Sequence, residues 1–104
     1  MENYRLSILA EDDLEGIFEY TYSHWGLEQA CHYRDLIEGG LAELIADPER
    51  PKSKARDDLL TGCRFYRVQH HYLVYRVKND VLEIGRVLHE QMNFEKHIAE
   101  KVFR

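Results

Sequence analysis

The sequence lacks the motifs that would bind a metal or a cofactor, and it has too few cysteines for a disulfide framework. Its two cysteines, Cys31 and Cys63, are not arranged as CxxC, and the six histidines do not complete a zinc pattern with them. We therefore expect two free, partly buried thiols in a reducing compartment. The six glycines form neither GxGxxG nor GxxxxGK[ST], and none of the three serines lies in a GxSxG elbow. We expect no cofactor, no nucleotide-binding loop and no serine nucleophile.

Long apolar runs are also missing, which argues against a membrane protein. No run approaches the ~20 residues of a membrane span. The first residues lack the basic start and apolar segment of a secretory signal, so the protein is expected in the cytoplasm. Of the 104 residues, 44% are hydrophobic and 32% charged, which is typical of a single folded domain, here residues 1–104.

The net charge of −5 hides an uneven distribution along the chain. Residues 1–49 hold 2 Lys and Arg against 12 Asp and Glu, whereas residues 50–104 hold 12 against 7. Such a division can mark two different binding surfaces, although acids on the solvent face of helices would give the same count.

Three apolar runs dominate the second half and predict a small sheet. They are Cys63–Val68, His71–Val77 and Val81–Leu88, and they are rich in β-branched and aromatic residues. The polar gaps between them, Gln69-His70 and Lys78-Asn79-Asp80, are too short for a parallel crossover, so the strands should form an antiparallel meander. Four arginines lie along these strands: Arg64, Arg67, Arg76 and Arg86.

The first half predicts a strand followed by a helical hairpin. A short alternation indicates a strand over Tyr4–Leu9, and the acids of residues 11–13 favour a helix start. Apolar positions with helical spacing run from Leu14 to Trp25 and from Ala30 to Ile45, with Gly26 as a cap between the helices. We expect Gly40 to allow close backbone approach. The aromatic side chains of this hairpin are expected in the core: Phe18, Tyr22, Trp25 and Tyr33.

The remaining segments complete an α+β fold. Glu49–Gly62 has no clear period and is expected to be an exposed connection, and Asn93 could cap a last helix over Phe94–Phe103. The expected order is strand, helix, helix, three strands and a terminal helix. The sequence thus predicts a helical hairpin packed on one face of a small, mostly antiparallel four-stranded sheet.

The sheet also carries the side chains best suited to chemistry. Arginines beside His89, with His70 and His71 at a turn, could serve a metal-free ribonuclease, which needs a base, an acid and cations for phosphorane charge. Alternatively, the arginines pair with helix carboxylates or form a protein-binding edge. The second interpretation is favoured, because phosphate neutralisation normally drives nuclease binding and the net charge here is negative.

The order of several short motifs resembles the ParE toxins of the RelE/ParE superfamily, and the resemblance covers nearly the whole chain. The motifs are Leu6-Ser7, Ala10, Asp13-Leu14, Ile17, Tyr20, Trp25-Gly26, Gln29-Ala30, Tyr33, Leu59, Gly62, Arg64, His71, Tyr75-Arg76, Ile84, Arg86-Val87-Leu88-His89, Met92 and His97.

This resemblance implies a toxin of a type II toxin–antitoxin system with a RelE/ParE-like fold. Such a toxin would inhibit DNA gyrase by protein–protein contact, without catalysis of its own, and form a hetero-oligomer with a ParD-like antitoxin. No membrane or sequence-specific nucleic acid is expected as a partner. The antitoxin tail would bind between the helical hairpin and the sheet, where either the acidic helices or the arginine-bearing strands would offer complementary charge. Candidate contact residues are Arg64, Arg67, Arg76, Arg86, His89 and His97.

Two alternatives stay open. One is a RelE-like, ribosome-dependent mRNA interferase that uses His89, Arg64 and Arg86 as catalytic residues. The other is a structural or regulatory module without toxicity.

Overall fold

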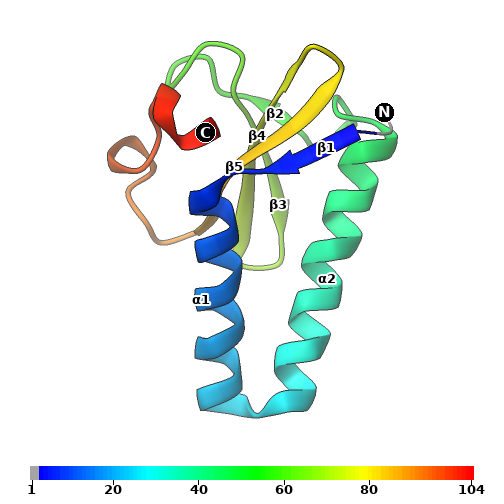
Figure 1. The fold of residues 1–104 in the computed structure, drawn as a ribbon, viewed down its shortest axis with the longest axis vertical. Coiled ribbons are helices and arrows are strands. Elements are labelled where there is room, and N and C mark those ends of the chain that lie inside the picture. The colour runs from blue at the N-terminus through cyan, green and yellow to red at the C-terminus, as the bar shows by residue number, and fades with distance from the viewer. Residues whose placement is uncertain (1–2) are drawn as a thin grey trace.

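The computed structural model describes residues 3–104, in which two long helices form a hairpin that extends well beyond a twisted sheet (Figure 1). In chain order the elements are β1 (Asn3–Leu6), α1 (Ile8–Trp25), α2 (Leu27–Ala46), β2 (Lys54–Ala55), β3 (Arg64–Val68), β4 (His71–Lys78), β5 (Val81–His89) and the short 3₁₀ turns η1 (Phe94–Lys96) and η2 (Glu100–Phe103). Across this described part, no helix combines the length and apolarity needed to cross a membrane.

The sheet confirms the α+β fold and adds one short strand to it. Its order is β1-β5-β4-β3-β2, in which β1 is parallel to β5 and every other pair is antiparallel. The fifth strand, β2, lies inside Glu49–Gly62, which was expected to be only an exposed connection. That segment is held to the body by Ser53, which is buried and hydrogen-bonds to Tyr75. Two residues of alternation are too few to be recognised as a strand in a sequence.

The start of α1 is fixed by Ser7. Its Oγ accepts a hydrogen bond from the Ala10 N–H at 3.0 Å and donates one to the Gly85 carbonyl at 2.7 Å. The helix therefore begins at Ile8, before the acidic turn that predicted its start, and β1 ends at Leu6. Gly26, with φ of 91°, ends α1 and joins it directly to α2.

Neighbouring strand residues point to opposite sides of the sheet, so each strand contributes side chains to both faces. Both faces are covered by packed apolar residues. The helical face holds the core residues Ala10, Ile37, Leu44, Tyr66, Leu73, Tyr75, Leu82, Ile84 and Val87. The other face holds Cys63, Phe65, Val74, Leu88 and Ile98. The predicted last helix is instead two 3₁₀ turns: Phe94 of η1 packs against Phe65 and Tyr72, and η2 lies against β5. A side chain at Gly85 would meet Phe103 at 2.9 Å, so glycine is needed there.

Several smaller predictions can be checked directly. Gly40 is buried and a side chain there would overlap Val68 of β3, which confirms the close approach to the sheet. Both cysteines are free, as expected, with Cys63 buried. The core assignment of Trp25 and Tyr22 was wrong: they are 63% and 54% exposed. They lie where the hairpin extends past the sheet, so no second layer covers them.

Candidate functional site

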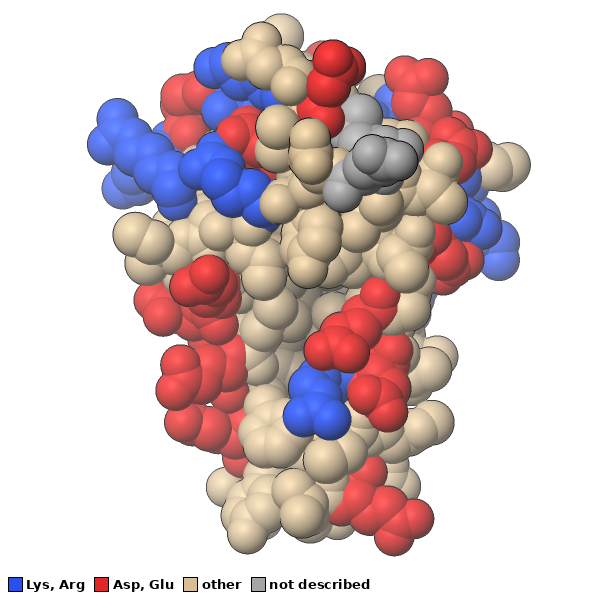
Figure 2. All heavy atoms as spheres, turned by 45° about the vertical axis from the view of Figure 1, so that its right-hand side comes forward, with Lys and Arg blue, Asp and Glu red and all other residues tan. Residues whose placement is uncertain are grey.

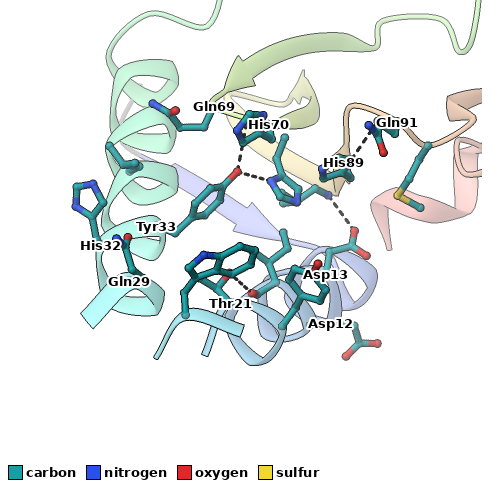
Figure 3. Close-up of a pocket in the computed structure, with 18 residues that line it drawn as sticks. Asp12, Asp13, Thr21, Gln29, His32, Tyr33, Gln69, His70, His89 and Gln91 are labelled. Atoms are coloured by element: carbon teal, nitrogen blue, oxygen red, sulfur yellow. Dashed lines mark hydrogen bonds between the residues drawn. The ribbon is translucent and has the colours of Figure 1, made fainter. Parts of the chain in front are cut away.

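Two grooves flank the helical hairpin. The first, called the histidine groove, has a volume of about 950 Å³ and lies between the hairpin and the β3–β4 turn and end of β5 (Figure 3). Its lining includes Asp12, Asp13, Gly16, Tyr20, Trp25, Gln29, His32, Tyr33, His70, His71, His89 and Met92. The second, called the apolar groove, measures about 740 Å³ and lies between α1, α2 and β1. Both grooves share the lining residues Ile17, Thr21 and Tyr33, which lie between α1 and α2. The two grooves therefore open on opposite sides of these residues.

A tyrosine and a histidine lie in contact in the histidine groove. The Tyr33 hydroxyl hydrogen-bonds to His71 Nδ1 and accepts the backbone N–H of His70 at 3.3 Å. His71 lies opposite His89 in the β4–β5 register, and their rings meet edge to face with centroids 5.1 Å apart. The register explains this contact, because both residues lie at similar distances from the Asn79-Asp80 turn.

Burial sets the charge state of this pair. It lowers the pKa of His71 to about 4, and positive charge on His89 or His70 acts in the same direction. Burial likewise raises the pKa of the Tyr33 phenol. Near neutral pH the pair is therefore an uncharged imidazole bonded to an uncharged phenol.

An ionic cluster lies beside the same turn. Glu90 accepts hydrogen bonds from His70 Nδ1 at 2.7 Å and from Arg67 Nη2 at 2.6 Å. The bond to His70, aided by the positive charge of Arg67, holds the pKa of the Glu90 carboxyl below its usual range. His89 Nδ1 accepts the backbone N–H of Gln91 at 3.1 Å, which leaves the other ring nitrogen as the one able to serve a ligand.

The other candidate arginines are paired within the fold. Arg86 donates from Nε and Nη2 to the two carboxylate oxygens of Asp13, both at 2.8 Å (the Arg86–Asp13 bridge), and Asp13 also accepts the Val87 N–H at 2.9 Å. Arg76 donates to Glu83 at 2.7 Å and to Glu100 at 2.6 Å.

Arg64 and His97 lie away from the histidine groove. The Arg64 side chain donates to the hydroxyl and the carbonyl of Ser53, at 2.9 and 3.2 Å. His97 is half-buried at the end of η1, where its N–H donates to the Phe94 carbonyl at 3.0 Å.

The three residues considered for catalysis are therefore not brought together. In the sheet register, Arg64 lies opposite Tyr75 and His89 lies opposite His71. Tyr75 and His71 are four residues apart along β4, so Arg64 and His89 are separated by about 13 Å along the strand direction. Arg86 is held by Asp13. In residues 3–104, no group of three or more His, Cys, Asp or Glu side chains is arranged to hold a metal ion.

Sequence reasoning missed three partners in this region. Tyr33 was assigned to the core, Asp13 was assigned to the start of the first helix, and Glu90 was given no role. Two signals pointed to Asp13: it belongs to a motif of the family resemblance, and one interpretation expected the sheet arginines to pair with helix carboxylates. That expectation holds for Arg86, but not for Arg64, Arg67 and Arg76, whose partners lie outside the helices.

The apolar groove has a different chemistry. Leu14, Phe18, Ile37, Leu41 and Ile45 line it, together with Tyr4 and Leu6 of β1. Its charged lining consists of Glu15, Glu38 and Arg34. Figure 2 shows this uncharged strip between the helices, with acidic side chains on both sides. From Ile8 to Ala46 the hairpin carries nine acidic residues and one arginine.

Comparison with known proteins gives a consistent result over nearly the whole chain. The family model "ParE toxin of type II toxin-antitoxin system, parDE" matches residues 4–94. The chain is 39% identical to Toxin ParE1 of Caulobacter vibrioides, over 95% of this chain and 100% of that protein. It is 35% identical to Toxin ParE of Escherichia coli, over 98% of each. A solved structure titled "Chromosomal ParDE TA system from P. aeruginosa" shares the fold, with a TM-score of 0.73 and 20% identity over 86% of this chain and 96% of that one.

Proposed function

This chain belongs to the ParE toxin family of type II toxin–antitoxin systems, and from that premise we propose that it inhibits DNA gyrase by protein–protein contact and is neutralised by a ParD-like antitoxin. The match to proteins named Toxin ParE, over almost the full length of both chains, carries the proposal. Both partners would be met in the cytoplasm.

The arrangement of the arginines supports action without catalysis. A metal-free nuclease needs cations aimed at the developing phosphorane charge. Arg86 is instead engaged by two carboxylate oxygens of Asp13, and Arg64 donates to Ser53 about 13 Å along the sheet from the histidines. Neither guanidinium is available to a phosphate at His89 without breaking its present contacts.

We place the antitoxin in the apolar groove. Antitoxin tails commonly fold on binding and lay an amphipathic segment on the toxin. An apolar floor rimmed by Glu15 and Glu38 fits a segment with apolar residues on one side and basic residues at its edges. The free edge of β1, whose Tyr4 and Leu6 line the groove, offers such a segment backbone partners as well.

Two matched variants test this placement. Ala42 is exposed and lines the apolar groove, whereas Ala46 is exposed and lies outside the described lining of both grooves. Ala42→Trp should weaken binding of the antitoxin at least tenfold, while Ala46→Trp should leave it within about twofold. Equal affinities for the two variants, measured by titration calorimetry, would refute the placement.

Gyrase inhibition is tested with purified proteins. Adding the toxin to gyrase and relaxed plasmid should block supercoiling and, after protein denaturation, leave linear DNA; prior addition of the antitoxin should prevent both effects. Normal supercoiling at a large molar excess of folded toxin would contradict the proposal.

The RelE-like interferase stays as the second candidate because proton-transfer groups do gather in one place. Tyr33, His70, His71 and His89 lie together in the histidine groove. This candidate predicts cuts at defined codon positions in a translating extract, and their loss in His89→Ala. Intact mRNA alongside gyrase-linked DNA breaks would exclude it.

A further inference from the structure

We propose that the histidine groove is the docking surface for the target, gyrase, through a segment of that enzyme bearing Lys or Arg. The inference rests on the proposed function and adds to it the surface used and the chemistry of the partner. The antitoxin and the target would then bind on different sides of one helical hairpin.

The first observation is an exposed aromatic cluster at the mouth of the groove. Tyr20 and Trp25 are 58% and 63% exposed, and both line the groove. His24 stacks on Tyr20 with ring centroids 4.0 Å apart, and the Tyr20 and Trp25 centroids are 6.2 Å apart. A cluster of large apolar rings exposed to water often marks an interaction site, and Trp and Tyr commonly carry much of the binding energy of an interface. They lie on the part of the hairpin that extends past the sheet, and no other element among the described residues covers them.

The second observation is the sign of the charge along the hairpin that carries these rings. The hairpin holds nine acids and one arginine from Ile8 to Ala46. Asp12 lines the groove, and it has no ion-pair partner among the described residues. Aromatic faces and a carboxylate that line the same groove both attract Lys and Arg, the rings by cation–π contact and the carboxylate by Coulomb attraction. A nucleic acid would bring phosphates against the same carboxylates, so the charge favours a basic protein segment.

The third observation is a glycine on the wall of the groove. Gly16 is exposed in the middle of α1, and a Cβ built there would meet nothing within 4 Å among the described residues. A glycine in a helix interior costs about 0.5–1 kcal/mol relative to alanine, and internal packing gives no reason for it here. It does leave room for a partner to approach the helix backbone closely.

The same glycine provides a test that does not disturb the fold. Gly16→Trp fills the wall of the groove, and Gly39→Trp is its matched control. Gly39 lies in α2, is also exposed with nothing within 4 Å, and is not among the described lining residues of either groove. Both variants should melt at or above the temperature of the unmodified protein.

The expected result is a loss confined to one partner. With reconstituted gyrase holoenzyme on a biosensor surface, Gly16→Trp should bind at least tenfold more weakly, while its antitoxin affinity stays within about twofold. Gly39→Trp should leave both affinities unchanged. A second pair reverses charge: Asp12→Lys, on the groove, should weaken gyrase binding severalfold more than Glu11→Lys, which lies outside the groove lining.

Three outcomes would overturn the inference, and they are distinguishable. Equal gyrase affinities for Gly16→Trp and the unmodified protein would refute the groove assignment alone. A loss of antitoxin binding in Gly16→Trp would assign the groove to the antitoxin instead. If the unmodified protein does not bind gyrase at all, the proposed function fails and this inference fails with it.

Discussion

Asp13→Ala removes the acceptor for three donors of β5 and should destabilise the protein by about 3 kcal/mol. The substitution leaves the Arg86 guanidinium and the Val87 N–H without the partners that they now have at 2.8–2.9 Å. Both charged side chains of the Arg86–Asp13 bridge are only 15% exposed. Breaking a buried ion pair by removing one partner costs about 3–5 kcal/mol, and the lower end applies because some water reaches this pair.

The double variant separates the unpaired charge from the lost contacts. Asp13→Ala with Arg86→Met removes the stranded cation and keeps an apolar side chain of similar length. It should recover roughly half of the lost stability. Urea unfolding followed by circular dichroism measures the free energy of unfolding of the single and the double variant. In a thermal melt, the single variant should unfold roughly 10–20 °C below the unmodified protein.

Two results would refute this reasoning. A loss below about 1 kcal/mol in Asp13→Ala would mean that water or another acceptor already satisfies Arg86. A double variant less stable than Asp13→Ala would mean that the guanidinium contributes through contacts other than Asp13.

Substitutions or titrations at Gly40, His71 and Cys63 test three other parts of the fold. Gly40→Ala should lose about 1–3 kcal/mol because its Cβ overlaps Val68, whereas Gly39→Ala, in open space, should gain about 0.5–1 kcal/mol in the same urea assay. The pKa of His71 is about 4 in the folded state and about 6.5 in the unfolded chain, so only the unfolded chain takes up a proton between these values. Stability should therefore fall by about 1–2 kcal/mol as pH drops from 6.5 to 4, after allowance for partial exposure; a profile identical to that of His71→Gln would contradict this. Burial raises the pKa of the Cys63 thiol to about 11, so mass spectrometry should find it unmodified by iodoacetamide until the protein unfolds.

The sheet was predictable because its signals are local. Alternation and two short polar gaps place β3, β4 and β5 within one or two residues of their observed ends. The positive φ values of Asn79 and Asp80, 53° and 61°, are those of the tight turn that the short gap implies. Helix ends that depend on distant partners were not predictable: Ser7 caps α1 with help from the Gly85 carbonyl, 78 residues away.

The site was less predictable for a related reason. Helical periodicity identifies which face of α1 is apolar, but it does not reveal that α1 continues past the sheet, which is why Trp25 is exposed. His71 and His89 were recognised as chemically useful side chains. Their contact with each other, and that of His71 with Tyr33 from α2, depends on strand register and on how the hairpin packs, which residue types alone do not encode.

The parallel pairing of β1 with β5 bears on when the toxin becomes complete during synthesis. Asn3–Leu6 is synthesised well before its partner strand, residues 81–84, and the Ile8 N–H donates to the Arg104 carbonyl at 3.1 Å. Contacts between segments so distant in the sequence form slowly, and they require almost the whole chain. A nascent chain that stops before β5 therefore lacks a partner for its first strand. The first strand, and the surfaces built on it, are therefore assembled only after β5 has been synthesised.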